Sequence, residues 1–247
     1  ERGIADMDRR KLEALFINYD MPMVHACIQG DMGRIETWKE KSVMASIGDF
    51  CFLAGYPVPE LVERAKAPIL VPCDKRWGEQ IEAVLGKRAV FFTRYATRRT
   101  PERFDRHKLY AFTRAMPKDF AIMPIDKEIY FILKEREWSQ DLCGCFTSGE
   151  DFQERGLGFV VTQGGVPVAG AASYAVCEGA VEIEIDTRPD FRRPGLAAAC
   201  GAKLILECLE RELYPGWDAH DRRSLALAQK LGYQLERSYS AYWVERK

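Results

Sequence analysis

Residues 191–212, FRRPGLAAACGAKLILECLERE, place two arginines, a proline and a glycine directly before a run of good helix formers. The first turn of a helix has backbone N–H groups without an intrahelical acceptor, and together with the helix dipole they attract an anion. Arg192 and Arg193 add fixed positive charge beside that turn. Pro194 favours a helix start, where a missing N–H costs little. The segment therefore predicts an anion-binding site.

The glycine and the neighbouring segments bear on this interpretation. Gly195 has no Cβ, so an anion can approach the backbone closely, and Leu196 and Ala197 would supply the next amides. The alternative is a solvated arginine pair ahead of an ordinary amphipathic helix. The setting favours the binding site, because an alternating strand, VEIEIDT (181–187), comes before it and a helix, DRRSLALAQKLG (221–232), comes after it.

These residues carry a family resemblance. RRPGLA (192–197) resembles the R/Q-x-x-G-x-G/A signature of the GNAT superfamily of acyl-CoA N-acyltransferases. Residues 181–209 resemble the central strand, pyrophosphate loop and helix of that superfamily, and 221–233 resemble one of its later helices. The likeness covers residues 120–247, the carboxy-terminal half. It implies a mixed α/β fold there, with a splayed central mixed sheet.

The resemblance also implies a ligand. The anion would be the pyrophosphate of coenzyme A, held mostly by backbone amides, and the end of the strand would pair with the pantetheine arm and the acyl carbonyl. Asp221 stands where the family commonly has asparagine, although an aspartate at a helix start is also a good N-cap. Acetyl-CoA is the expected cosubstrate, and no metal is expected. The expected cofactor-binding residues are Ile185, Asp186, Thr187, Arg192, Arg193, Gly195, Leu196, Ala197 and Asp221.

Acyl transfer to an amine also needs a base, often a carboxylate acting through water. Glu182, Glu184 and Asp186 share one face of the alternating strand, and the apolar residues share the other. The acidic face is either the cleft or an exposed surface. We expect Glu184 to be the base, since it lies nearest the expected position of the acyl group. His220, directly before Asp221, is the second candidate.

The acid that protonates the departing thiolate is less evident. Many family members have a tyrosine seven residues after the asparagine, and here that position is Ala228. Tyr233, Tyr239 and Tyr242 are candidate substitutes. The leading hypothesis is an N-acetyltransferase that moves an acetyl group from acetyl-CoA to a small-molecule or peptide amine. The alternative is a coenzyme A-binding regulatory or interaction protein without catalytic activity.

Other elements follow from apolar spacing and turn residues. In the second half we expect strands at 120–126, 181–187 and 214–219, a hairpin about a Gly-Gly turn within 158–176, helices at 127–138 and 148–156, and one or two closing strands within 233–245. In the first half we expect strands within 44–55, 68–73 and 89–95 and helices within 9–21 and 77–86. Turn formers and charges at 116–119 predict a domain boundary. The two domains would be 1–119, an α/β domain of unknown role that we expect to form one wall of the acceptor site, and 120–247, the acetyltransferase domain.

Composition narrows the class of protein. The 247 residues are 47% hydrophobic and 30% charged with a net charge of −1, which gives no support to nucleic acid or membrane as a partner. No apolar run reaches the ~18 residues of a membrane span, and the start has no continuous signal-peptide core. Eight scattered cysteines predict reduced thiols and a cytoplasmic location, and Cys143 and Cys145 with three histidines do not favour a metal site. A homodimer is considered as the oligomeric form.

Overall fold

The computed structural model describes residues 7–192 and 195–245, and the chain forms two compact units. Unit 1 comprises Glu1–Arg94 and Ser238–Lys247, and unit 2 comprises Tyr95–Arg237. The chain passes between the units within two strands, β5 (Ala89–Thr97) and β12 (Leu235–Val244). Among the described residues, no helix has the length and apolar character that crossing a membrane requires.

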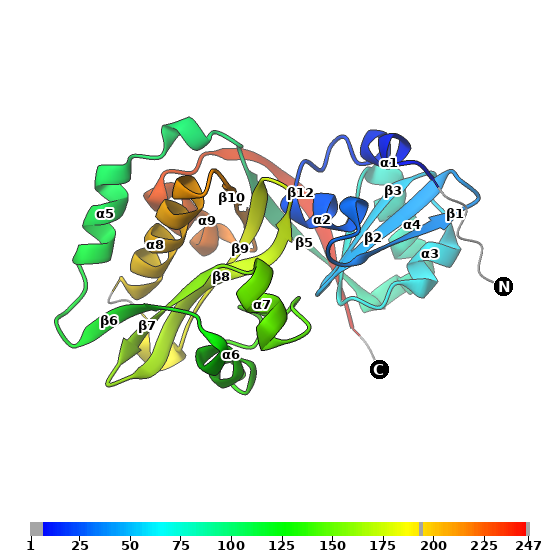
Figure 1. The fold of residues 1–247 in the computed structure, drawn as a ribbon. Coiled ribbons are helices and arrows are strands. Elements are labelled where there is room, and N and C mark those ends of the chain that lie inside the picture. Colours follow the sequence, from blue (N-terminus) through cyan, green and yellow to red (C-terminus); the bar gives the residue numbers. More distant parts are fainter. Residues whose placement is uncertain (1–6, 193–194, 246–247) are drawn as a thin grey trace. The chain divides into compact units, whose positions relative to one another are not determined.

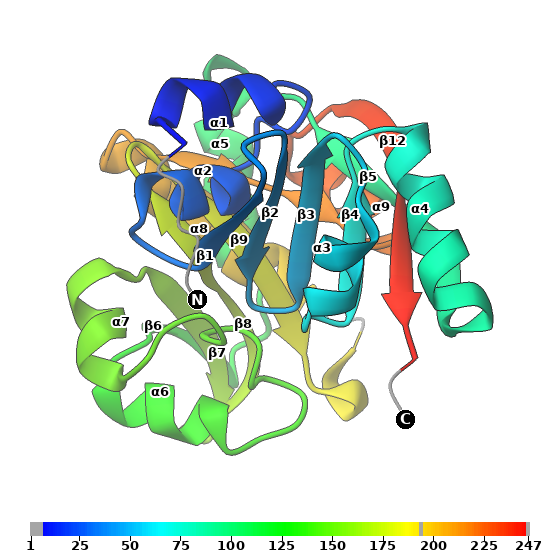
Figure 2. The same cartoon turned by 90° about the vertical axis from the view of Figure 1, so that its right-hand side faces the viewer.

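Unit 1 contains a mixed sheet in the order β1-β2-β3-β4-β12. Figure 2 shows β1 to β4 side by side; β3 and β4 are parallel, whereas β1–β2, β2–β3 and β4–β12 are antiparallel. The strands are β1 (Arg34–Trp38), β2 (Ser42–Ile47), β3 (Phe50–Gly55) and β4 (Ile69–Pro72), and the helices are α1 (Arg9–Leu15), α2 (Pro22–Gln29), α3 (Pro59–Arg64) and α4 (Lys75–Leu85), with a 3-10 turn η1 (Gly86–Arg88).

The two faces of this sheet are covered by different helices. Cys51 and Leu53 of β3 pack in one buried cluster with α3 and with Trp77 of α4. Phe52 points the other way, toward the α1–α2 side, where its ring centroid lies 6.0 Å from that of Tyr19. The first unit is therefore a sheet with helices on both faces.

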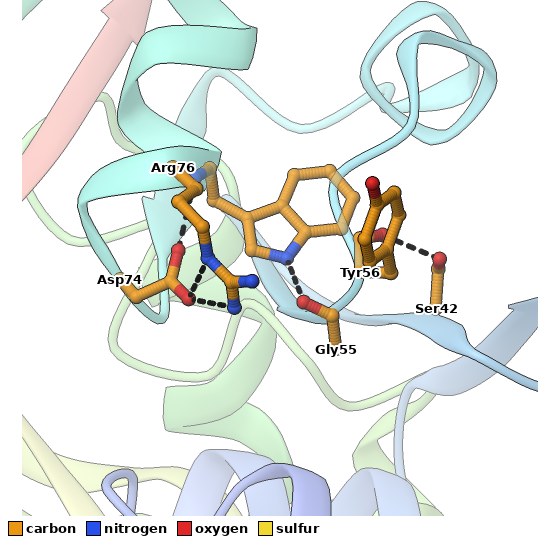
Figure 3. A network of polar contacts seen from close by, with 6 residues as sticks. Ser42, Gly55, Tyr56, Asp74 and Arg76 are labelled. Atoms are coloured by element: carbon orange, nitrogen blue, oxygen red, sulfur yellow. Dashed lines mark hydrogen bonds and ion pairs between the residues drawn. The ribbon is translucent and has the colours of Figure 1, made fainter.

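Polar contacts close the carboxyl ends of β3 and β4. Asp74 caps α4 by accepting the backbone N–H of Trp77 at 3.0 Å, and its other oxygen pairs with Arg76. The indole N–H of Trp77 donates to the backbone carbonyl of Gly55 at 3.0 Å. Figure 3 shows Gly55, Asp74 and Arg76 in this network, with Ser42 bonded to the Tyr56 carbonyl beside it.

Unit 2 contains a five-stranded sheet in the order β10-β9-β8-β7-β6, in which only β9 and β10 are parallel among the described strands. Its long helix α8 lies across this sheet (Figure 1). The strands of this sheet are β6 (Phe120–Pro124), β7 (Gly158–Gln163), β8 (Val166–Cys177), β9 (Ala180–Thr187) and β10 (Tyr214–Gly216). A further short strand, β11 (Asp218–Ala219), pairs with β5. The helices are α5 (Arg106–Arg114), α6 (Lys127–Lys134), α7 (Gly149–Arg155), α8 (Leu196–Glu210) and α9 (Arg222–Leu231), with 3-10 turns η2 (Pro101–Arg103) and η3 (Pro189–Phe191).

Helix α8 is the centre of the core of unit 2. Its apolar side joins Val181 and Ile183 of β9 in one buried cluster. Gly201 lets the helix approach its neighbours, because a Cβ there would lie only 2.9 Å from both Ile185 Cδ1 and Leu231 Cδ1. The small residues of α8 therefore let the helix lie close to β9 and α9.

Both units contain a similar run of elements. In unit 1 two helices precede β1, β2, β3, α3, β4 and α4, and the chain then enters β5. In unit 2 two helices precede β7, β8, β9, α8, β10, the two-residue β11 and α9, and the chain then enters β12; unit 2 also has α5 and β6 ahead of this run. In each run the third and fourth strands are parallel neighbours. Strand β3 can therefore be compared with β9, and β4 with β10.

The expected mixed α/β fold with mixed sheets is confirmed. The Gly164-Gly165 hairpin, the strand at 181–187, the helix after Gly195 and the helix capped by Asp221 all form. Other elements differ. Residues 44–55 make parts of two strands with a turn between them, 214–219 divide into β10 and β11, and β1, α2, α3 and α5 were not expected.

The units also divide the chain at other places than residue 119. Helix α5 precedes that residue, yet its Leu109 is fully buried in the core that α8 centres. Arg106 and Tyr110 of the same helix donate to the Leu209 carbonyl and to Glu210 at 3.4 and 3.2 Å. At the other end of the chain, Tyr242 of β12 pairs with Leu70 of β4 in unit 1. Local composition reveals neither that α5 belongs to unit 2 nor that most of β12 belongs to unit 1.

We expect Leu109→Ala to lower the free energy of unfolding of unit 2 by about 2–5 kcal/mol, because it leaves a cavity against α8. The matched control is Lys108→Ala on the exposed side of the same helix, which should change it by less than about 0.5 kcal/mol. Urea denaturation of the full chain measures both. Equal effects of the two variants would mean that α5 is not part of this core.

Candidate active site

Strands β9 and β10 separate after the first three residues of β9. Their parallel pairing runs from Ala180↔Tyr214 to Glu182↔Gly216 and stops there. The chain then turns at Trp217, and the next residues, β11, pair with β5 instead. On its other edge β9 stays paired with β8 as far as Thr187. Residues 183–187 thus have one backbone edge with no strand partner among the described residues, and we call this opening the fork.

The start of α8 is the second component. Gly195 is its N-cap, with φ 83° and ψ 10°, and no side chain caps the helix. This left-handed conformation favours glycine, and a Cβ added there would meet nothing within 4 Å. The backbone conformation therefore favours glycine, whereas the room around its Cα would admit a Cβ. Leu196 and Ala197 follow with first-turn amides that have no intrahelical acceptor. Arg193 lies outside the described residues.

The loop from β9 to α8 is held by local contacts. Arg188 forms a two-pronged ion pair with Asp190, at 2.7 and 2.8 Å, and its guanidinium lies 4.3 Å from the centroid of the Phe191 ring. Arg192 follows at the end of η3 with its side chain exposed. The loop therefore carries one paired arginine and, next to the helix start, a second, exposed one.

The acidic face of β9 is not simply exposed. Val181 and Ile183 face α8, so Glu182, Glu184 and Asp186 point to the opposite side of the sheet. Glu182 is 4% exposed, and the other two carboxylates are half-buried. The alternation in the sequence thus places one buried acid, Glu182, just before the fork and two half-buried acids, Glu184 and Asp186, within it.

Asp186 has an unusual electrostatic environment. Its pKa is raised from 3.8 to about 6, mainly by burial and also by the charge of Asp141, while the charge of Arg192 lowers it. The segment after α6 covers this part of the sheet: a Cβ on Gly170, the cross-strand neighbour of Asp186, would lie 2.6 Å from Leu142 Cδ1. Asp186 is therefore influenced both by Asp141 of the covering segment and by Arg192 of the loop before α8.

His220 and Asp221 lie at the junction of β11 and α9. His220 is exposed. One oxygen of Asp221 accepts the backbone N–H groups of Arg223 and Ser224, both at 2.8 Å, and the other accepts the Arg223 guanidinium at 3.0 Å. Burial opposes ionisation, but these hydrogen bonds lower the pKa of Asp221. The N-cap interpretation is confirmed, whereas a contact with a cofactor stays a prediction.

Each of the three candidate tyrosines makes a contact within its own unit. Tyr233 is buried and donates to the Pro215 carbonyl at 2.8 Å, and burial raises its pKa well above 10. Tyr242 belongs to unit 1, where burial and its bond to Glu82 at 2.7 Å raise its pKa to about 12. Tyr239 also belongs to unit 1 and packs on Tyr19. Ala228 is fully buried in the core. The Tyr233 hydroxyl is therefore bonded to a carbonyl and the Tyr242 hydroxyl to a carboxylate.

Two further observations concern ligands. The hydroxyl of Thr187, at the end of the fork, is buried and has no hydrogen-bond partner in the described part of the chain, so a ligand there would satisfy it. A separate cavity of about 270 Å³ reaches Glu207, about 16 Å along α8 from Leu196. It contains none of the expected site residues. Within residues 7–192 and 195–245, no group of three metal-ligating side chains gathers.

This arrangement, a parted strand pair beside a glycine-capped helix start, has relatives. Residues 13–242 match the sequence profile of the GNAT acetyltransferase family. The chain belongs to this family. The match spans nearly the whole chain, so the expectation that the resemblance is confined to the carboxy-terminal half is wrong. The short signature at residues 192–197 is local, whereas the family profile extends over both units.

Individual relatives agree with this family. A crystal structure of a GCN5-related N-acetyltransferase-like protein from Streptococcus suis is 41% identical, with 96% of this chain and 98% of that chain aligned at a TM-score of 0.93. An uncharacterized N-acetyltransferase of Bacillus subtilis, YdfB, is 26% identical over 204 residues, 78% of this chain and 71% of that protein. A GCN5-related N-acetyltransferase from Kribbella flavida, 14% identical with a TM-score of 0.60 over 92% of this chain and 96% of that one, shares the fold. The family uses acetyl-CoA, and membership supports acyl transfer.

Sequence reasoning missed two features of this site. Asp141 comes from a segment without a recognisable motif and reaches Asp186 only through the fold. The open edge begins at Ile183, so it is longer than the stretch 185–187 that was expected to pair with the pantetheine arm. The resemblance also implied that this strand splays from the next one near GWDAH, 216–220, and the paired part of β10 ends at Gly216.

The raised pKa of Asp186 predicts how stability depends on pH. Since the folded state holds this proton more tightly than the unfolded chain, whose carboxyl has a pKa near 3.8, stability falls as pH rises from about 4 to 6. Asp186→Asn should therefore raise the free energy of unfolding at pH 7 by up to ~3 kcal/mol and leave it unchanged at pH 3. Thermal denaturation across pH measures this. An effect of Asp186→Asn that does not vary with pH would contradict the assignment.

Proposed function

We propose that the protein is an N-acetyltransferase that moves an acetyl group from acetyl-CoA directly to an amine on a small molecule or peptide. The observation that carries the proposal is the fork in β9 beside the start of α8. A strand edge with no neighbouring strand can bond to the amide groups of a pantetheine arm as another strand would. A helix start with exposed amides can accept the pyrophosphate at the end of that arm.

Each part of the cofactor has a candidate partner. The amides of Leu196 and Ala197 and the charge of Arg192 suit the pyrophosphate, with Gly195 allowing close approach. The backbone of residues 183–187 suits the pantetheine arm and the acyl carbonyl, and a strand N–H there can stabilise the negative charge that develops on the carbonyl oxygen. The hydroxyl of Thr187 is a further donor for the same ligand.

The proton of the amine needs an acceptor near the acyl group. Glu184 is half-buried on the face opposite α8 and is the base that we propose. Asp186, on the same face with a pKa of about 6, is the neighbour that can share this role, since its pKa is close to neutral. His220 is the other candidate, exposed at the start of α9. The acidic face also suits an acceptor that arrives as a cation.

The alternative proposal is a coenzyme A-binding regulatory or interaction protein without turnover. Two observations favour it. Position 228, where many family members have the tyrosine that acts as the acid, is a buried alanine, and the hydroxyls of Tyr233 and Tyr242 already donate to other groups. Thiol release from acetyl-CoA with a panel of amines separates the two proposals. Binding of acetyl-CoA without turnover of any amine would support the alternative.

The helix start can be tested by a charge. We expect Ala197→Asp to weaken acetyl-CoA binding at least ~10-fold by repelling the phosphates, and the effect should shrink as salt screens it. The same acid in the first turn interacts favourably with the helix dipole, by about 0.3–1 kcal/mol, so stability should hardly change. Calorimetric titration with acetyl-CoA measures the affinity.

The control is Ala197→Asn, which has nearly the same size and no charge. It should bind acetyl-CoA more tightly than the Asp variant. A valine at Gly195 is a poor test, since its φ of 83° would strain any β-branched residue. Equal binding by parent, Asn and Asp variants would show that the helix start is not the phosphate site.

The base can be tested by isosteric amides. If Glu184 accepts the proton, Glu184→Gln should lower kcat by about 10²–10⁴-fold with little change in acetyl-CoA affinity. If Asp186 does so instead, kcat/KM of the parent should fall as pH drops below about 6, and Asp186→Asn should show the loss. Steady-state rates over pH 5–9 distinguish them. Parental rates in both variants would leave His220 or water as the acceptor.

A further inference from the structure

Each unit contains a pair of parallel strands at a corresponding place, β3 and β4 in unit 1 and β9 and β10 in unit 2. Only the pair in unit 2 separates before its end. In unit 1 the N–H of Ile69 donates to the Asp49 carbonyl at 3.0 Å, and four residues later the N–H of Cys73 donates to the Leu53 carbonyl at 2.9 Å. Parallel ladders advance by two residues on each strand, so this ladder is continuous. The next carbonyl, that of Gly55, is taken by the Trp77 indole.

The same ladder begins in unit 2. The N–H of Tyr214 donates to the Gly179 carbonyl at 2.9 Å, which is the counterpart of the bond from Ile69 to Asp49. Four residues later the ladder would carry the N–H of Asp218 to the carbonyl of Ile183. Instead, this N–H donates to Oε1 of Glu182 at 2.8 Å. A side chain of β9 has replaced the backbone of β9 as the acceptor.

The type of residue at this position fits the difference. The counterpart of Glu182 in unit 1 is Phe52, which cannot accept a hydrogen bond and is fully buried against the α1–α2 side. Glu182 is itself 4% exposed. A carboxylate this deeply buried is costly unless it is well bonded, and a charge-assisted bond to a backbone N–H is among the stronger ones.

We infer that Glu182 is a positioning residue that keeps the fork open. Its carboxylate satisfies the N–H of Asp218, so that β11 does not close onto β9 and the edge from Ile183 onward remains available to a ligand. The inference rests on the proposed function only in naming acetyl-CoA as that ligand. It assigns Glu182 no proton transfer, which distinguishes it from Glu184 and Asp186.

Two variants separate the acceptor oxygen from the charge. Glu182→Gln keeps an oxygen that can accept from Asp218, and Glu182→Met removes it at similar size. We expect the Gln variant to keep kcat and acetyl-CoA affinity within about threefold of the parent. We expect the Met variant to fold, with unchanged or higher thermal stability. It should bind acetyl-CoA at least ~10-fold more weakly, because the ladder closes. A variant that was merely destabilised would not combine weaker binding with unchanged stability.

A crystal structure of the unliganded Glu182→Met variant tests the cause directly. The expected result is a bond of about 3 Å from the N–H of Asp218 to the Ile183 carbonyl. A fork that stays open, or parental acetyl-CoA affinity in this variant, overturns the inference. A parent that binds no acetyl-CoA overturns the proposed function, and the crystal structure of the variant still decides the role of Glu182.

Two further results keep the test decisive. A loss of more than about 100-fold in kcat for Glu182→Gln would show that the carboxylate transfers a proton, against the inference. Should the Met variant not fold, the amide proton of Asp218 is compared by NMR in the parent and in Glu182→Gln. Its chemical shift should change on loss of the charged acceptor, and an unchanged shift would show that the bond does not form.

Discussion

The parting of β9 from β10 at Trp217 is the constraint on which the candidate site depends. Strands in a sheet normally satisfy each other's backbone groups, and an interrupted ladder leaves polar groups that need other partners. Here one N–H is taken by the buried carboxylate of Glu182, and the departing strand finds a new neighbour in β5. The edge that remains is rigid on its far side, because β8 pairs with β9 as far as Thr187. The opening therefore lies within a fixed scaffold.

The helix that follows β9 gives the opening its direction. Gly195 turns the chain into α8 with a left-handed residue, and Gly201 lets the helix lie against Ile185 and Leu231. The amides of the first turn then lie next to the loop that carries Arg192. On the other side of the sheet, Asp186 meets Asp141 and feels the charge of Arg192. The proposed phosphate site and the proposed base are thus joined by one strand, β9, and the loop that follows it.

The two units show how a similar run of elements can serve different ends. In unit 1 the third and fourth strands stay paired, the indole of Trp77 closes their ends, and α3 has only six residues. In unit 2 the corresponding strands part and α8 has fifteen residues. Phe52 in one sheet and Glu182 in the other mark this difference at a single position. The family match over residues 13–242 is consistent with both units belonging to one fold.

The sequence alone determined the local parts of this protein. Alternation in VEIEIDT set the faces of β9, the Gly-Gly pair made a hairpin, and Asp221 capped α9, because each depends on neighbours within a few residues. Only the tertiary structure decided the rest. The burial of Glu182, the electrostatic effect of Asp141 on Asp186 and the membership of α5 and β12 in the units all depend on contacts between residues far apart in the chain. Such contacts leave no periodic signal in the sequence, since either partner alone suits several environments.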